Sequence, residues 1–227
     1  MTTFSAAAAI AGKDLRIEAR SRERLPAMLL FAALVLLVMH FAIGLDTADR
    51  HELAPGVLQA AFLFAGTLGL YRSFAPETEA MAIHGLMLGP VDRSSIYFGK
   101  LASGTLLLLA VEIPVVLLYE LFFRANLLGS QSVNGLLLFG AILLCFSLGF
   151  MALGTTVAAI CAATPVREVL LPLLLFPLSA PLLIAGVSGM RAAMAGEPVW
   201  EAARFLVLAA VAFVSVSWMV FEFALEE

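Results

Sequence analysis

The sequence predicts an all-α integral membrane protein with six membrane-spanning helices, on the basis of its composition, its long apolar runs and the placement of its charges. Of the 227 residues, 62% are hydrophobic and 13% are charged, against about 45–50% and about 25% in soluble domains. The mean hydropathy is +1.02. A soluble fold of this length has too little polar side chain to cover so much apolar surface. A soluble enzyme, a disordered chain and a nucleic-acid-binding protein are therefore excluded.

The apolar runs are long enough to cross a bilayer as helices, which takes about 17–25 residues. They are also continuous, which excludes the alternating apolar and polar pattern of a membrane β-barrel. The predicted spans are residues 25–45, 55–71, 96–123, 133–163, 169–187 and 205–225. Residues 25–227 are thus expected to form one transmembrane domain.

The Lys and Arg residues in the loops and near the ends of the spans predict the orientation. With six spans both termini share one side of the membrane, and that side receives nine of the 13 Lys and Arg residues, while the other side receives four. Cytoplasmic loops of membrane proteins carry the excess of positive charge. Both termini are therefore predicted to be cytoplasmic.

Residues 1–24 precede the first span and are predicted to form an interfacial amphipathic helix over 4–24. Apolar residues recur there at steps of three and four, and basic residues point elsewhere. The apolar positions are Phe4, Ala8, Ala11 and Leu15, and the basic positions are Lys13, Arg16 and Arg20. Such a helix lies among lipid headgroups with its basic side chains near anionic lipid. The alternative is a plain positively charged anchor before the first span.

Two predicted spans are irregular. The fourth has about 31 residues and a length of about 46 Å, so either its cytoplasmic end projects from the membrane or the helix breaks near Gly149 or Gly154. The fifth contains Pro172, Pro177 and Pro181, which predicts a kink or local unwinding. Unwound turns must face protein or a cavity. This span is either a moving part or pathway wall, or it carries a static kink that helps packing.

Residues 72–95 predict a short cytoplasmic amphipathic helix between the second and third spans. Pro76 suits its first position, and Glu77 and Glu79 suit its first turn. Ile83, Leu86 and Met87 form its apolar side, and Gly89-Pro90 ends it. This side could rest on the membrane or fit a groove on a partner protein.

Two ionisable side chains inside predicted spans are candidate functional groups, because such groups are costly in a membrane. Glu112 lies about 18 Å along the third span from Lys100, and His40 lies about 22 Å along the first span from Leu25. Similar depth would allow a hydrogen bond between them. Glu112 is either part of a transport or coupling path, or a structural carboxyl that is hydrogen-bonded or protonated.

Several motifs are absent from the sequence. It has no phosphate-binding G-x-x-x-x-G-K-[ST] loop, no C-x-x-C-H haem attachment motif and no Cys/His spacing typical of a metal site. It shows no set of nucleophile, base and orienting residue. We therefore expect no catalytic residue, no metal ligand and no directly bound cofactor, and hence a chain that is not an enzyme by itself.

Six segments carry a resemblance to a known family when they are taken in order. They are KDLRIEARSRE at 13–23, RSF at 72–74 with Glu77 and Glu79, GLMLGPVDRS at 85–94, GKL at 99–101, REVLLP at 167–172 with Pro177, and FEF with LEE at 221–227. Together they resemble the cytochrome c maturation protein B family (CcmB, a haem exporter permease) over nearly the whole chain. Two residues depart from the family pattern: Pro76 stands where a basic residue is expected, and Met81 where a glycine is expected.

The resemblance implies an inner-membrane permease subunit of an ABC transporter in cytochrome c maturation. Two copies would pair, each with a CcmA-like ATPase on the loop helix. The loop residues implied in this contact are Glu77, Glu79, Ile83, Leu86 and Met87. Other implied partners are CcmC-, CcmD- and CcmE-like haem-handling proteins. ATP hydrolysis by the partner would drive haem export or delivery and release of the haem-loaded periplasmic chaperone, with ATP bound by that partner and haem as the handled ligand.

Other functions fit the same architecture. One is an ABC permease that exports another substrate, such as a lipid, a drug or a peptide, which a chromosomal neighbour would distinguish. Another is an ion-coupled secondary transporter with Glu112 as its proton site, although the sequence shows neither an inverted repeat nor several acidic groups at the midplane. A purely structural membrane scaffold is a further alternative.

Overall fold

The computed structural model describes residues 3–43, 50–73, 92–123, 133–162, 164 and 166–224. These residues form α-helices and no β-strand. The helices are α1 (Thr3–Ser21), α2 (Arg24–Ile43), α3 (Arg50–Ser73), α6 (Arg93–Phe123), α7 (Val133–Ala162), α8 (Arg167–Ala195) and α9 (Trp200–Ala224). The all-helical prediction is confirmed over this part of the chain.

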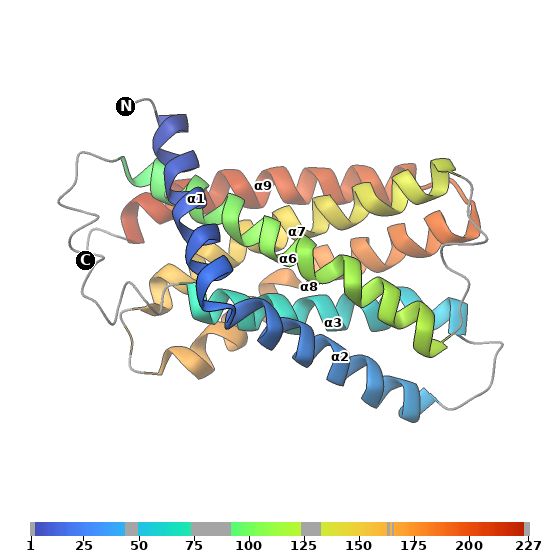
Figure 1. Cartoon of the computed structure of the whole chain (residues 1–227). Coiled ribbons are helices and arrows are strands. Elements are labelled where there is room, and N and C mark those ends of the chain that lie inside the picture. The colour runs from blue at the N-terminus through green and yellow to red at the C-terminus, as the bar shows by residue number, and fades with distance from the viewer. Residues whose placement is uncertain are drawn as a thin grey trace.

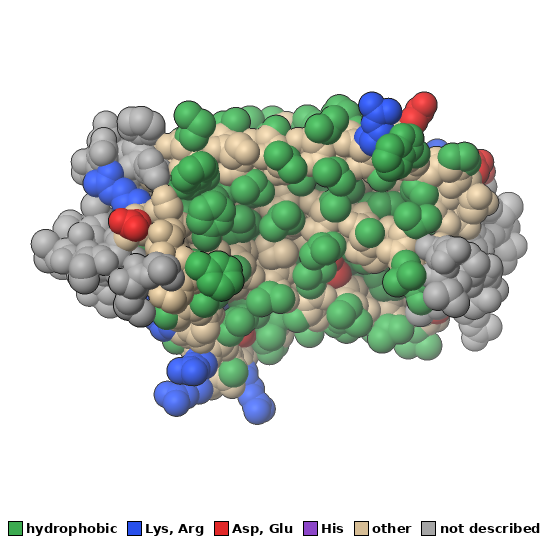
Figure 2. All heavy atoms as spheres, turned by 90° about the horizontal axis from the view of Figure 1, so that it is seen from above, with side chains coloured by type: hydrophobic (Ala, Val, Ile, Leu, Met, Phe, Trp, Pro, Cys, Tyr) green, Lys and Arg blue, Asp and Glu red, His purple; other side chains and the backbone are tan. Residues whose placement is uncertain are grey.

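Six of these helices lie side by side, and α1 crosses one end of the bundle (Figure 1). The start of α1, the end of α3, the start of α6 and the end of α9 share that end, which we call the α1 end. Each of the six is long and apolar enough to cross a membrane. Figure 2 shows apolar side chains over the middle of one face and charged side chains mostly toward the two ends. Six apolar helices are thus found where the sequence predicts spans, while the side of the membrane that the α1 end faces stays a prediction.

Helix α7 is the central element and contacts α3, α6, α8 and α9. The rings of Phe146 and Phe150 are buried on it and stack 5.7 Å apart. Gly149 lets α8 and α9 approach closely, because a Cβ there would stand 3.0 Å from Leu182 and 3.2 Å from the Ala210 Cα. Small residues at such contacts allow the tight packing that holds membrane helices together.

Helix α7 is unbroken over Val133–Ala162, so the predicted break near Gly149 or Gly154 is wrong. Both glycines make helix contacts instead, and Gly154 packs against Leu70 of α3. The 30 residues of α7 extend for about 45 Å, against a hydrocarbon core of about 30 Å. The other alternative, an end that projects beyond the bilayer core, is the one that fits this length.

Helix α8 is also continuous, over Arg167–Ala195, although Pro172, Pro177 and Pro181 lie inside it. Local unwinding at these prolines is therefore wrong, and a kink at them stays a prediction. Pro172 is half-buried, whereas Pro177 and Pro181 are exposed on the outside of the bundle. The expectation that the proline turns face protein or a cavity thus fits Pro172 alone within this chain.

Helices α1 and α2 meet at a fixed corner. Helix α1 ends at Ser21, because Arg22 has a φ of 52° and its N–H donates to the Glu18 carbonyl (2.8 Å), as at many left-handed helix ends. The Glu18 carboxylate then accepts from the N–H groups of Arg24 (3.1 Å) and Leu25 (2.8 Å). It therefore caps the first turn of α2, whose N–H groups have no acceptor within the helix.

Helix α1 packs on α6 through a side that differs from its predicted apolar stripe. Its buried residues are Ala6, Ile10, Ala11, Asp14 and Glu18. Phe4 is 84% exposed, and Ala8 is exposed as well. The predicted stripe consists of apolar residues alone, whereas the side that packs on α6 also includes the carboxylates Asp14 and Glu18. The placement of the stripe among lipid headgroups stays a prediction.

Gly99 sets how closely α1 approaches α6, since a Cβ there would stand 2.8 Å from the Ile10 Cβ and 2.9 Å from the Ala7 carbonyl oxygen. We expect Gly99→Ala to lower the free energy of unfolding by about 1–3 kcal/mol through overpacking. Gly140→Ala is the control, because a Cβ at Gly140 meets nothing within 4 Å and should stabilise the helix by about 0.5–1 kcal/mol. Thermal unfolding in detergent measures both variants, and equal midpoints would contradict the close contact.

Candidate functional site

The loop residues predicted to contact an ATPase lie outside the described residues. They are Glu77, Glu79, Ile83, Leu86 and Met87. Both ends of their segment are described, because α3 ends at Ser73 and Asp92 directly precedes α6. The candidate site is therefore built from the helices that begin and end this segment.

Lys100 of α6 joins three helices at the α1 end. Its Nζ lies 3.1 Å from Asp14 Oδ2 on α1 and donates to the Ser73 carbonyl at the end of α3 (3.0 Å). Ser103, nearly one turn further along α6, donates to the same Asp14 oxygen (3.4 Å). A cationic side chain at the end of a helix satisfies a carbonyl that has no donor within that helix. One buried ammonium thus holds α1, α3 and α6 together.

Asp14 forms ion pairs of two kinds. Lys13 Nζ lies 3.2 Å from its Oδ1, and the Lys13 side chain is 42% exposed, whereas the Lys100 side chain is 3% exposed. Exposed pairs contribute about 0–1 kcal/mol, but removing one member of a buried pair costs about 3–5 kcal/mol. Removal of Lys100 alone is therefore expected to destabilise the protein far more than removal of Lys13.

The start of α6 has further anchors. The Ser95 hydroxyl donates to the Thr3 carbonyl at the start of α1 (3.2 Å). The Trp218 indole N–H of α9 donates to the Ser94 hydroxyl (2.9 Å). The first turn of α6, where the loop segment ends, is thus tied to two other helices.

The contact between Lys100, Asp14 and Ser73 is not identified from the sequence, although the sequence contains one signal for it. Lys100 lies inside the predicted third span, where a lysine is costly unless it is paired. Asp14 and Glu18 both lie in the preceding N-terminal helix. Which of these carboxylates meets Lys100 depends on how α1 crosses α6, and periodicity within one helix does not contain that information.

Glu112 is fully buried in α6 and bonds to the central helix. Its Oε1 accepts a hydrogen bond from the Ser147 hydroxyl of α7 (2.5 Å), and its Oε2 has no hydrogen-bond partner among the described residues. The carboxyl therefore connects α6 to α7 in the middle of the bundle. The sequence predicts a polar group at this depth but not the identity of its partner.

His40 lies far from Glu112, so the hydrogen bond considered between them is wrong. The His40 ring contacts Phe123 and Phe122, with centroids 5.1 Å and 6.1 Å away. These residues lie at the end of α6, about 15–17 Å beyond Glu112 along the helix. His40 is packed among aromatic rings.

Counting residues from the start of each span places His40 and Glu112 at similar depth, but α2 and α6 do not start at the same depth in the bundle. Arg24, at the start of α2, donates through Nε to the Gly69 carbonyl of α3 (3.1 Å). Lys100 donates to the Ser73 carbonyl of the same helix, one turn nearer the α1 end. Helix α2 therefore begins deeper in the bundle than Lys100, which moves His40 toward the opposite end.

Glu112→Gln should keep the thermal unfolding midpoint near that of the unsubstituted protein, because an amide oxygen can still accept from Ser147. Glu112→Ala should cost about 1–3 kcal/mol, since the buried Ser147 hydroxyl then loses its acceptor. Glu197→Ala, at an exposed position, is the control for loss of a carboxyl. If Gln destabilises as much as Ala, the negative charge itself is required, and the structural account of Glu112 fails.

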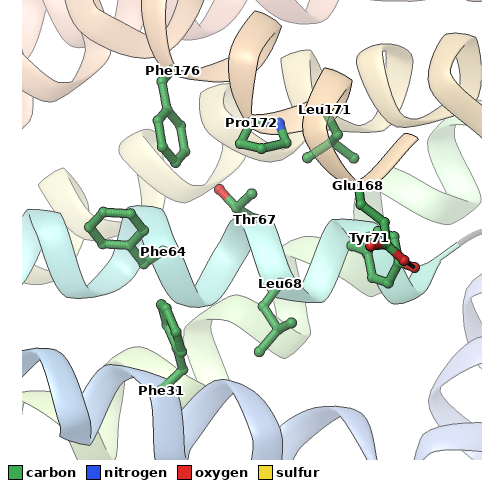
Figure 3. Close-up of a pocket in the computed structure, with 9 residues that line it drawn as sticks. All are labelled: Phe31, Phe64, Thr67, Leu68, Tyr71, Glu168, Leu171, Pro172 and Phe176. Carbon is green, nitrogen blue, oxygen red and sulfur yellow. Dashed lines mark hydrogen bonds between the residues drawn. The ribbon is translucent and has the colours of Figure 1, made fainter. Parts of the chain in front are cut away.

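A groove of about 480 Å³ opens between α2, α3 and α8 (Figure 3). Three phenylalanines from the three helices line one end, with the Phe64 ring 6.0 Å from Phe31 and 5.6 Å from Phe176. At the other end the Tyr71 hydroxyl donates to the Glu168 carboxylate (2.6 Å). The volume is within the range of small-molecule sites, about 300–1,000 Å³, and most of the lining is apolar.

In the described part of the chain, no cluster of His, Cys, Asp and Glu is placed to hold a metal ion. The geometry at the α1 end joins helices at the two ends of an intervening segment. Such an arrangement can transmit a displacement of that segment to long helices.

The profile of the CcmB protein family matches residues 5–226. This chain belongs to the CcmB family. A relative from Bradyrhizobium diazoefficiens, named heme exporter protein B, is 28% identical over 215 residues, covering 93% of this chain and 92% of the relative. Heme exporter protein B from Pseudomonas aeruginosa is 27% identical over 186 residues, covering 82% and 81%. The family resemblance of the ordered segments is confirmed, and this CcmB protein is a multi-pass membrane transport protein.

Proposed function

We propose that this chain is the permease subunit of an inner-membrane ABC transporter that exports or delivers haem in cytochrome c maturation. The match to the CcmB family over residues 5–226 carries the proposal, and the two relatives named heme exporter protein B support it. Six apolar helices supply the membrane part. Because the sequence has no P-loop, ATP would bind to a separate subunit.

The α1 end would face the cytoplasm and meet the ATPase. Lys13, Arg16 and Arg20 are exposed there, as expected of a cytoplasmic surface near anionic lipid. Segment 74–91, with its predicted apolar side, connects two helices that end at this place. Coupling requires that the ATPase contact the segment differently in its two states, so that hydrolysis moves α3 and α6.

The assembly would contain two copies of this chain, each with one CcmA-like ATPase. CcmC-, CcmD- and CcmE-like proteins would complete it, and hydrolysis would release the haem-loaded periplasmic chaperone. The outside of α8 supports an assembly, because Pro177 and Pro181 are exposed there and each leaves a backbone carbonyl without its usual donor. Such carbonyls are costly against lipid and are tolerated where protein covers them.

Affinity purification from native membranes in mild detergent, followed by mass spectrometry, tests the proposal. We expect an ATPase with a P-loop, together with CcmC-like and CcmE-like proteins. Recovery of an ATPase without those partners would support the permease role but indicate another substrate, such as a lipid, a drug or a peptide. Repeated recovery of the chain alone in several detergents would contradict the proposal and favour an ion-coupled secondary transporter.

Ile83→Asp and Met87→Asp should each reduce the amount of ATPase that co-purifies, because a charge on the predicted apolar side opposes its burial in a partner groove. Met81→Asp is the matched control, since Met81 lies on the opposite side of the predicted helix. All variants should insert into the membrane at the usual level. Unchanged ATPase recovery with Ile83→Asp and Met87→Asp would count against this contact.

A further inference from the structure

Lys100 connects the two helices between which segment 74–91 runs. Its ammonium donates to the carbonyl of Ser73 (3.0 Å), which is the last residue of α3. Lys100 itself belongs to α6, whose first residue follows Asp92. The distance between the two ends of the segment is therefore set by a bond made within the bundle.

Helix α1 supplies the charge that this bond needs. The Asp14 and Lys100 side chains are 6% and 3% exposed, so this pair compensates the two charges inside the bundle. Gly99, next to Lys100, has no side chain, so α1 can pack closely enough for Asp14 to reach Lys100. A second bond, from Ser95 to the Thr3 carbonyl, fastens the start of α1 to the first turn of α6. Helix α1 is thus fixed at two places across the start of α6.

We propose that Lys100 is a positioning residue which, with Asp14 as its counter-ion, fixes the end of α3 relative to the start of α6, so that both helices move together when a partner ATPase acts on the segment between them. This inference rests on the proposed function, in which the segment contacts that ATPase. Helix α1 then stabilises the place where α3 ends and α6 begins. Without the link the ATPase still binds, because its contact residues are unchanged, but hydrolysis no longer moves α3 and α6 together.

Two variants separate the effect of an unpaired buried charge from the loss of the bond between Lys100 and α3. Lys100→Met removes both and leaves Asp14 beside the exposed Lys13. The double variant Asp14→Leu/Lys100→Met replaces the buried pair by apolar side chains, a change that often preserves stability, yet the Ser73 carbonyl still loses its donor. Lys13→Met is the matched control, because Lys13 contacts the same carboxylate (3.2 Å) but is 42% exposed.

The test compares these variants as complexes purified from native membranes. Three quantities are measured: ATPase recovered per permease, cytochrome c matured per ATP hydrolysed, and backbone hydrogen exchange in α1 and at the end of α3. We expect ATPase recovery to stay at the normal level in all variants. Lys100→Met and the double variant should lower cytochrome c matured per ATP by about fivefold or more, the low end of couplings between distant sites. Lys13→Met should not change it.

Hydrogen exchange reports the link without depending on activity. The end of α3 should exchange faster in both Lys100 variants, and α1 should exchange faster in Lys100→Met alone, because the double variant keeps an apolar contact with α6. Normal exchange at the end of α3 would overturn the inference. So would equal cytochrome c yield per ATP in the double variant and in Lys13→Met.

A loss of ATPase recovery in step with the yield would also overturn the inference, since Lys100 would then serve binding or folding. Absence of the ATPase from the unsubstituted complex is a different result, because it contradicts the proposed function itself. In that case the coupling role falls as well, and hydrogen exchange still decides whether Lys100 joins α1 to α3.

Discussion

The Lys100 side chain is 3% exposed, so its ammonium group has lost nearly all of its hydration and the fold must replace that water. A charge moved into apolar surroundings costs several kcal/mol even after the protein relaxes. Lys100 therefore needs an anion and a hydrogen-bond acceptor within about 3 Å. Asp14 of α1 and the Ser73 carbonyl of α3 supply them. The relative positions of these helices follow from this requirement, because a shift of any one of them would leave a buried charge without its partner.

The middle of the bundle is held differently. Helices within a lipid bilayer gain little from the hydrophobic effect between them, because lipid tails are as apolar as their side chains. Close packing takes its place, as at Gly149, which lies near Leu182 and Ala210. The hydrogen bond between Ser147 and Glu112 adds one polar contact between α6 and α7. Polar bonds thus fix the α1 end, and shape complementarity fixes the membrane part.

The sequence predicts the six long helices because each must be apolar over a full bilayer thickness, a property that can be read one segment at a time. The same approach leaves open a break near Gly149 or Gly154, which the continuous α7 does not have, since a glycine that weakens an isolated helix is favourable where a neighbouring helix comes close. It also overestimates how strongly the prolines of α8 unwind the helix, because the effect of a proline depends on the residues that surround the helix. The partners of Glu112 and Lys100 are not predictable in this way, since they depend on the rotation and offset of one helix against another.

The corner at Arg22 has a consequence for the order in which the chain is assembled in the membrane. Helix α1 is synthesised before α6, so Lys100, which pairs with Asp14, emerges much later than its partner. Until then the charges of α1 keep it out of the bilayer core, and the Glu18 cap lets α2 begin as a separate helix. Closure of α1 is therefore a late step that requires the third span to be in place. Before that step, the side of α1 that carries Ile10 and Asp14 is uncovered, and only the completed bundle buries it.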